Sequence, residues 1–241
     1  RDFCLSRGLG DVYKRQTFNM AHKATPEQRN ERLRSFVAAT REMIEQDDFD
    51  KIHIRKIAEK AGFHNSTLYS YFKDAEYLIS LASVKFFDQY SRSLADLSDK
   101  NLSEQDNFYE IWRFFCLNAF MFPEIYYNFF FGKHSDDLTA IFEEYYSIFP
   151  NEEYKHSSKI HSMYVGKNIN IRCLDILKPL IGLDGNRLSE ENVTIANSLI
   201  IAYFKTLLEQ VLVYRKDNKE VDTDDLTTQF MTTLEFIIKT D

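Results

Sequence analysis

The chain has 241 residues, of which 44% are hydrophobic, and it carries a formal net charge of −7. This length provides core for one large domain, or for a small domain joined to a larger one. The acidic charge argues against a protein that coats nucleic acid with its whole surface. Seven glycines and four prolines are few for this length and favour helices over hairpins.

Three cysteines, at positions 4, 116 and 173, show neither disulfide nor metal-ligand spacing. A sparse, odd count of this kind suits the reducing cytoplasm. The most apolar stretch, residues 111–131, contains Arg113, Asn118, Pro123 and Glu124, so it lacks the ~20 lipid-facing residues of a membrane span. We therefore expect a cytoplasmic protein with no membrane partner.

Residues 1–19 show no sustained hydrophobic period and no signal-peptide core. Because residues 5–16 look like a translated sequencing adapter, we expect residues 1–19 to be a non-native or disordered leader. The natural protein would then start at Met20. The alternative is a genuine disordered arm, which in DNA-binding proteins can reach into a minor groove.

A first helix is predicted from residue 25 to about residue 46. Thr25 has the character of an N-cap, Pro26 occupies the first helical position, and Gln28 completes a capping box. An apolar stripe follows through Leu33, Phe36, Val37, Thr40 and Ile44. We expect this helix to pack beneath the pair of short helices that comes next.

Two short helices are predicted at residues 54–61 and 65–72. The first has one-sided apolar spacing and ends at Gly62, where a left-handed residue is favoured. The second buries Leu68, Tyr71 and Phe72 on one face and exposes hydroxyl and amide groups on the other. Two short helices joined by a turn that contains glycine are a helix-turn-helix candidate, and the exposed groups suit base edges and phosphates.

Positive charge is concentrated on this pair of helices. Residues 51–73 contain one acidic residue, Glu59, against five basic ones, Lys51, Arg55, Lys56, Lys60 and Lys73. Residues 81–241 contain sixteen basic and twenty-five acidic residues, a net charge of −9. The cationic surface that a phosphate backbone requires therefore coincides with the helix-turn-helix.

Four short runs in this segment resemble the DNA-binding signature of the TetR/AcrR family of bacterial transcription regulators. They are Ile57-Ala58, Ala61-Gly62, Thr67-Leu68-Tyr69 and Tyr71-Phe72-Lys73, and the resemblance extends over about residues 25–82. It implies an all-α chain with an N-terminal three-helix helix-turn-helix domain, residues 20–80. A larger helical effector-binding and dimerisation domain, residues 81–241, would follow.

By position, the resemblance also implies a set of DNA contacts. Thr67, Tyr71 and Lys73 would hold phosphate, and Asn65, Ser66, Tyr69 and Ser70 would face bases. Arg55 adds positive charge nearby. The sequence departs from the family pattern where His53 and His64 stand at the two N-cap positions; because histidine caps poorly, Asn65 could cap the second helix instead of reading a base.

A connecting helix is predicted from Asp74 to about residue 97, joining the two domains. Further helices are expected at residues 103–121, 124–132, 136–149, 152–177, 189–215 and 223–238. We expect aromatic side chains of this part to line a roomy effector cavity for an apolar or flat ligand: Trp112, Phe115, Tyr126, Phe130 and Tyr164. Asn168 and Arg172, one turn apart, would anchor an anionic effector; ordinary core packing and a solvated helix face are the alternatives.

The helix at residues 189–215 is apolar on more than one side, and such a helix usually has two partners. We expect it to form a homodimer with the last helix as a four-helix bundle, the mode of dimerisation that the resemblance also implies. The expected interface residues are Ile200, Tyr203, Leu207, Val211, Phe230 and Leu234. The alternative is a helix central to its own domain.

Taken with the resemblance, these features predict a sequence-specific transcriptional regulator, a ligand-responsive repressor that binds a double-stranded DNA operator as a homodimer. A small-molecule effector would set its affinity for DNA. The sequence shows no Gly-rich phosphate loop, nucleophile elbow or His-x3-His pair, so we expect no enzyme, cofactor or metal. The alternative function is a dimeric interaction adaptor or co-regulator on the same scaffold with a weakened DNA reader.

Overall fold

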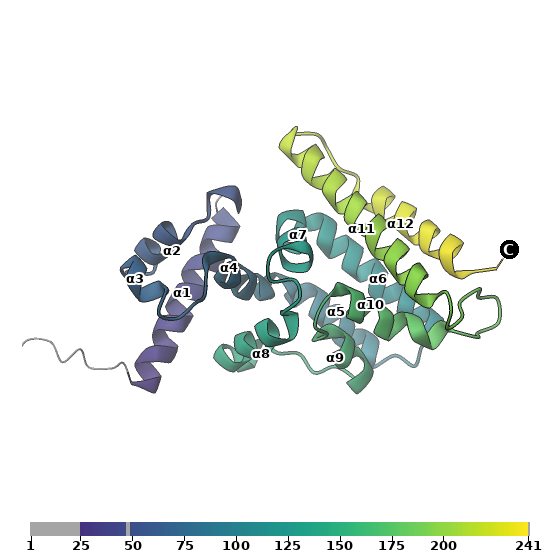
Figure 1. The fold of residues 1–241 in the computed structure, drawn as a ribbon, viewed down its shortest axis with the longest axis horizontal. Helices are drawn as coiled ribbons and strands as arrows, with labels where there is room; N and C mark the ends of the chain where they lie inside the picture. Colours follow the sequence, from purple (N-terminus) through teal and green to yellow (C-terminus); the bar gives the residue numbers. More distant parts are fainter. Residues whose placement is uncertain (1–24, 47–48, 241) are drawn as a thin grey trace, which may run out of the picture.

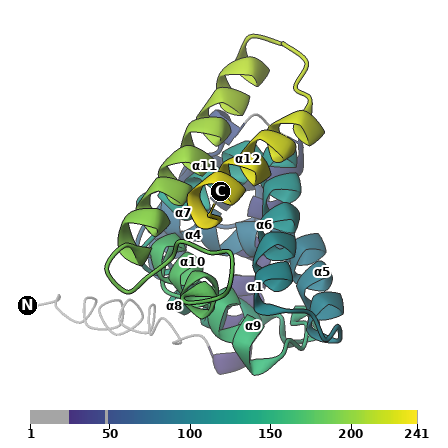
Figure 2. The same ribbon diagram turned by 90° about the vertical axis from the view of Figure 1, so that its right-hand side faces the viewer.

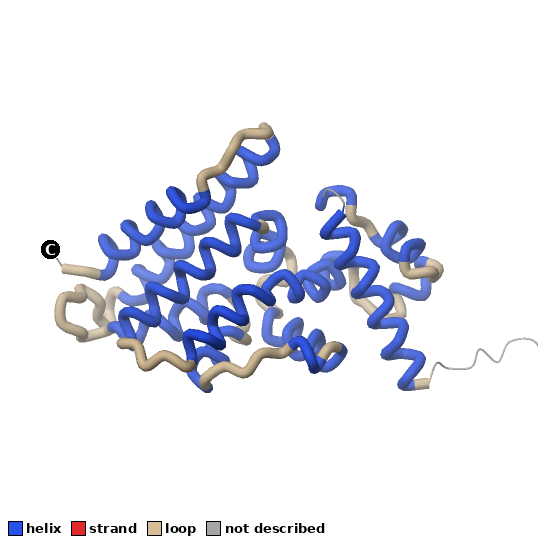
Figure 3. Tube along the Cα trace, turned by 180° about the vertical axis from the view of Figure 1, so that it is seen from behind, coloured by secondary structure: helices blue, strands red, loops and turns tan. Residues whose placement is uncertain are grey.

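The computed structural model describes residues 25–46 and 49–240. Figure 3 shows these residues as helices joined by loops, and their one pairing outside helices is an isolated bridge between Asn186 and Lys239. The predicted all-α fold is confirmed. The predicted leader, residues 1–19, lies outside the described residues.

The α-helices of the described residues run along the chain in the order shown in Figure 1. They are α1 (Pro26–Gln46), α2 (Ile54–Lys60), α3 (Asn65–Leu68), α4 (Ala75–Ser83), α5 (Asp88–Ser98), α6 (Glu104–Met121), α7 (Pro123–Phe131), α8 (Leu138–Ile148), α9 (Ser158–Tyr164), α10 (Ile169–Leu177), α11 (Val193–Lys216) and α12 (Thr223–Ile238). Short 3-10 helices lie at η1 (Phe49–Lys51), η2 (Val84–Phe87), η3 (Pro150–Glu152) and η4 (Lys178–Leu180).

Helices α1, α2 and α3 form a small unit at one end of the molecule, and the helices from α4 onward form the body (Figure 1). The predicted capping box at the start of α1 is confirmed, since the Thr25 and Gln28 side chains each accept a hydrogen bond from the other's backbone N–H at 3.3 and 3.1 Å. The core of the unit is built around Phe36. Its ring lies 5.0 Å from that of Phe63 and 6.0 Å from that of Phe72 between centroids, so this one aromatic side chain of α1 holds the helix pair in place.

The connecting helix is interrupted. Helix α4 leaves the small unit, but at η2 the chain tightens to a 3-10 turn before α5 begins. The tighter turn brings Phe87 into the aromatic centre of the body, where its ring centroid lies 4.7 Å from Tyr126 and 4.6 Å from Phe129. The prediction of one α-helix over residues 74–97 is therefore wrong at η2, because core packing outweighs the uniform helical pattern.

The long helix predicted at residues 152–177 is also wrong. The chain forms η3, then α9, and after a turn at residues 165–168 it forms α10. Side-chain caps restart the helix twice, because Ser157 accepts from the Ile160 N–H at 3.4 Å and Asn168 accepts from the Ile171 N–H at 3.0 Å. At Gly166 a Cβ would meet Arg172 Cγ at 2.8 Å, so the turn brings the backbone against the next helix.

Helices α11 and α12 pack side by side on the face of the body away from α1–α3, as Figures 1 and 2 show together. Helix α11 starts at Val193, after its N-cap Asn192, and not at residue 189 as predicted. By length and composition it is the one helix of the described residues that could cross a membrane, but nearly half of its apolar part is buried inside the chain. Core helices have the same character, so this is weak evidence for a membrane span.

Candidate functional site

The turn between α2 and α3 has the geometry that the sequence predicted. Gly62 adopts a positive φ of 78°, and the N–H groups of Gly62 and Phe63 donate to the carbonyls of Glu59 and Ala58 at 3.0 and 2.8 Å. These two bonds form a Schellman motif, which ends α2 and turns the chain towards α3. Only a residue that tolerates left-handed backbone fits at position 62.

Helix α3 is capped by His64 and not by Asn65. His64 Nδ1 lies 3.4 Å from the Ser66 backbone N–H, which it accepts, and 3.0 Å from Ser66 Oγ. The expectation that Asn65 would serve as the cap is wrong, and Asn65 is the first residue of the helix. His53, by contrast, makes no side-chain cap bond at the start of α2.

The regular part of α3 is one turn, shorter than the predicted helix over residues 65–72. The chain continues in turns, with the Ser70 and Tyr71 N–H groups donating to the carbonyls of Thr67 and Leu68 at 3.0 and 2.9 Å. Of the residues predicted to contact DNA, Arg55, Ser66, Tyr69, Ser70 and Lys73 are exposed, and Asn65, Thr67 and Tyr71 are half-buried. Tyr69 is 59% exposed, an unusual position for a large aromatic side chain without a partner.

Two arginines of α1, which the sequence pattern did not single out, belong to the same surface. The guanidinium of Arg29 lies 4.9 Å from the Tyr71 ring centroid, and Arg32 Nη1 donates to the Tyr71 hydroxyl at 3.5 Å. Their spacing of three residues on α1 places both over the end of α3. Tyr71 is thus held between the Phe36 core and two cations, so its hydroxyl is presented in a fixed place.

Residues 36–80 match the family model described as bacterial regulatory proteins, tetR family. This segment, which spans the helix-turn-helix, is therefore similar to the DNA-binding domain of tetR-family regulators. No curated protein matches the chain. Among solved structures it is similar to a TetR transcriptional regulator from Rhodococcus sp. RHA1, with a TM-score of 0.47, 17% identity and coverage of 88% of this chain and 97% of that one. It is also similar to the SmeT–triclosan complex, with a TM-score of 0.48, 12% identity and coverage of 88% and 93%.

Asp74 joins α1–α3, which carry the helix-turn-helix and are called the reader below, to the body of helices that follows. Its carboxylate caps α4 by accepting from the Tyr77 N–H at 2.7 Å, and it pairs with Lys133 at 2.9 Å and with His134 Nε2 at 2.9 Å. Next to it, Lys73 pairs with Asp137 at 3.3 Å. The loop between α7 and α8 is therefore bound to the residues that directly follow the reader.

Burial alone would raise the pKa of Asp74, but the hydrogen bonds from Lys133, the Tyr77 N–H and His134 outweigh it and lower the pKa to about 2.

A second polar cluster joins α1 to the end of α8. Arg41 pairs with Glu152 at 3.2 Å and donates to the Tyr145 hydroxyl, and Arg34 donates to the Ile148 carbonyl at 2.8 Å. The reader is thus held to the body on two sides.

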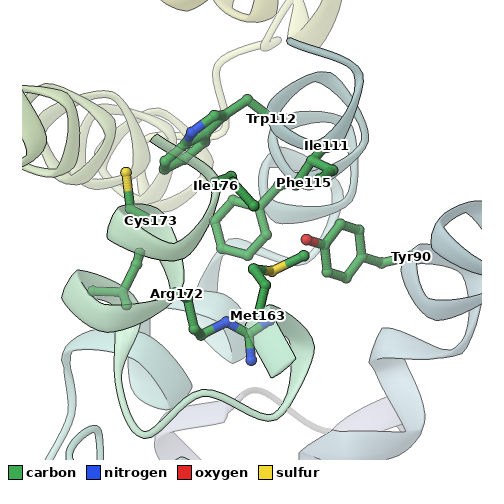
Figure 4. Close-up of a pocket in the computed structure, with 9 residues that line it drawn as sticks. Tyr90, Ile111, Trp112, Phe115, Met163, Arg172, Cys173 and Ile176 are labelled. Carbon is green, nitrogen blue, oxygen red and sulfur yellow. The ribbon is translucent and has the colours of Figure 1, made fainter. Parts of the chain in front are cut away.

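The predicted effector residues do not form a roomy cavity. Trp112, Phe115 and Arg172 line a cavity of about 20 Å³, shown in Figure 4, which has space for one water molecule. Tyr126, Phe130 and Tyr164 pack around this group, with ring centroids of Tyr126 and Phe130 at 5.3 and 5.0 Å from that of Phe115. The cavity is therefore too small for an effector in this conformation.

Asn168 is not an anchor beside Arg172, and that prediction is corrected. It is the N-cap of α10, and its amide donates to Asp136 at 2.7 Å on the surface. Arg172 points inward and is only 4% exposed. The prediction placed Asn168 and Arg172 one turn apart on a continuous helix. Because α10 starts at Ile169, Asn168 lies outside the helix.

Among the described residues, no three His, Cys, Asp or Glu side chains gather to hold a metal ion.

The residues predicted for a dimer interface lie inside their own chain. Five of them are buried, Ile200, Leu207, Val211, Phe230 and Leu234, and Tyr203 is half-buried and stacked on Phe230. The exposed apolar side chains of α11 are instead Ile195, Leu199 and Val213, on the opposite side of the helix. The prediction that α11 is apolar on two sides is confirmed, but the assignment of the sides was inverted.

We expect Asp74→Asn, which keeps an N-cap side chain but removes the charge, to lower stability at neutral pH by on the order of 1 kcal/mol. The pKa of Asp74 is about 2 in the folded chain and 3.8 ordinarily, so its contribution is complete above pH ~4 and disappears as the pH falls towards 2. Urea unfolding at several pH values should show the two proteins converge in acid. Asp184→Asn, at an exposed position without an ion pair among the described residues, should show no gap; a gap for Asp74→Asn that persists in acid would contradict the assignment.

Proposed function

We propose that this chain is a ligand-responsive transcriptional repressor that binds a double-stranded operator as a homodimer in the cytoplasm. The observation that carries the proposal is the surface at α3, where Tyr69, Ser66 and Ser70 are exposed and Arg29 and Arg32 lie against the nearby Tyr71. Polar side chains that can meet base edges are thus followed in the chain by a tyrosine held beside two cations that can hold phosphate.

Dimerisation is supported by the outward side of α11. Ile195, Leu199, Ala202, Thr206 and Val213 form one exposed uncharged stripe, directly opposite the side that enters the core. On the neighbouring helix α12, Phe236 is 73% exposed. A two-fold related pair of these faces would cover both stripes in a four-helix bundle and would place the two readers on one side of the DNA.

Ligand response is supported by the way the cavity is connected to the reader. Arg172 donates to the Tyr164 carbonyl, and the turn after α9 accepts from Thr139 Oγ1, at the start of α8, through the Val165 carbonyl at 2.7 Å. The loop that precedes α8 bonds the same turn through Asp136 and Asn168, and it holds Asp74 through His134. A ligand that displaced α9 would therefore change the support beneath the reader, and a coupling of ~1–3 kcal/mol would change DNA affinity 5- to 150-fold.

We expect Tyr69→Ala to weaken binding to the DNA upstream of the chain's own gene at least about tenfold, because a lost base contact costs ~1–3 kcal/mol. Lys56→Ala should lower affinity for all sequences alike and reduce the salt dependence of log K by about one. Both can be measured by fluorescence anisotropy across a salt series, with the free energy of unfolding as a check on folding.

Tyr154→Ala and Lys216→Ala are the matched controls, since Tyr154 bonds Arg92 of α5 and Lys216 ends α11, both outside the helix-turn-helix. They should leave DNA affinity and its salt dependence unchanged. Salt-steep, sequence-specific binding by the wild type that is lost in Tyr69→Ala supports the regulator. If the folded wild type binds no neighbouring promoter, the adaptor reading replaces it.

We expect Leu199→Glu to convert the dimer to a monomer, because symmetry places two unpaired carboxylates in an apolar interface. Light scattering after size-exclusion chromatography should show about half the mass, and operator affinity should fall at least about tenfold with loss of the paired half-sites. Leu183→Glu, at an exposed apolar position in a turn, should remain dimeric. A dimer that survives Leu199→Glu would place the interface elsewhere.

A further inference from the structure

Arg172 is a buried cation without an anionic partner. Its guanidinium lies over three aromatic rings, at 5.2 Å from the centroid of Phe130, 5.7 Å from Phe142 and 5.5 Å from Tyr164. Its Nη1 donates to the Tyr164 carbonyl, and among the described residues no carboxylate forms an ion pair with it. Buried charges are ordinarily paired, because an isolated one loses its hydration without compensation.

Two polar groups of this region have hydrogen-bonding capacity that no oxygen or nitrogen uses. The Tyr126 hydroxyl and the Trp112 indole N–H are buried and make no hydrogen bond to oxygen or nitrogen. The Tyr90 hydroxyl lies close enough to interact with the guanidinium. Burial lowers the pKa of Arg172, which shows the cost of keeping the cation there. A site that offers a positive charge and hydroxyl groups able to donate, with no carboxylate of the described residues paired to it, is complementary to an anion.

The remaining wall is hydrocarbon. Ile111, Met163, Ile169 and Ile176 line the cavity together with Trp112 and Phe115 (Figure 4). A second cavity of about 160 Å³ shares Ile111 and Ile176 with it and extends to the surface beside Lys159. Movement of these two isoleucines would join the cavities into a narrow apolar path that ends at Arg172, and Met163 has the flexibility to make room.

We propose that Arg172 anchors a binding site for organic monocarboxylates with a narrow apolar body. A planar guanidinium binds a carboxylate through two parallel hydrogen bonds, and a single buried cation matches a single negative charge. The apolar body would occupy the path past Ile111 and Ile176. As an effector site it rests on the ligand response proposed above, whereas carboxylate binding itself is a property of the cavity alone.

Trp112 is the chain's one tryptophan, so its fluorescence reports on this cavity without any DNA. The test titrates the full chain with octanoate and with its neutral isostere octanamide, and then with benzoate and benzamide for a flat body. We expect saturable changes in Trp112 emission for at least one acid, with its amide at least about tenfold weaker, the value of charge-assisted hydrogen bonds. Equal affinities within both pairs, or no change with any of the four, would overturn the proposal.

Arg172→Met should reduce the affinity for the acid to that of the amide. The matched control is Arg113→Met, which removes an exposed arginine next to Trp112 in sequence and should keep the preference for the acid. Circular dichroism establishes whether Arg172→Met folds; if it does not, the comparison of acid and amide in the wild type decides. An Arg172→Met variant that folds and keeps the preference would sink the assignment.

A DNA-binding measurement separates the two proposals. Octanoate or benzoate that binds the cavity and weakens operator binding at least 5-fold supports both the site and the regulator. Acid-selective binding by a chain that binds no DNA supports the carboxylate site and removes the proposed function. DNA binding by a chain whose Trp112 responds equally to acid and amide keeps the regulator and removes the carboxylate site.

Discussion

The arrangement of the molecule depends on the carboxylate of Asp74. It begins α4 as an N-cap and pairs with Lys133 and His134 from the loop between α7 and α8. Asp74 directly follows Lys73, the last residue of the helix-turn-helix segment, so its pairs fix the reader to the body beside that segment. The cluster of Arg34 and Arg41 on α1 fixes the reader on its other side. A flexible linker would not have this property, since it would leave the reader's orientation undetermined.

The sequence identified those elements whose signals are local. Thr25 and Gln28 fixed the start of α1, Gly62 fixed the end of α2, and the apolar residues of the helix pair fixed its buried side. Each of these depends on residues within a few positions of one another. The predictions that failed required knowledge of distant partners. Nothing in the residues near Phe87 shows that the aromatic centre it enters is formed by α7, and so the 3-10 turn was missed.

The same reason explains the errors at the candidate sites. For α11, the pattern showed two apolar sides but could not say which of them meets α10 and α12 and which is left exposed. For Asn168 and Arg172, a spacing of four on a continuous helix would place them together. The turn at residues 165–168 separates them, so that one becomes a cap on the surface and the other a cation in the core.

That separation gives the α9–α10 turn two attachments with different environments. Arg172 ties it to the core through the Tyr164 carbonyl, and Asn168 ties it to Asp136, one residue before the aspartate that pairs with Lys73. Leu138 adds a backbone bond to the Lys167 carbonyl at 3.0 Å. A change in the charge balance around Arg172 acts on a buried contact that water does not screen, whereas the surface pairs at Asp136 and Asp137 are screened and adjust at low cost. In the proposed ligand response, a ligand would therefore act at the buried end of this connection, and the reader would move at the exposed end.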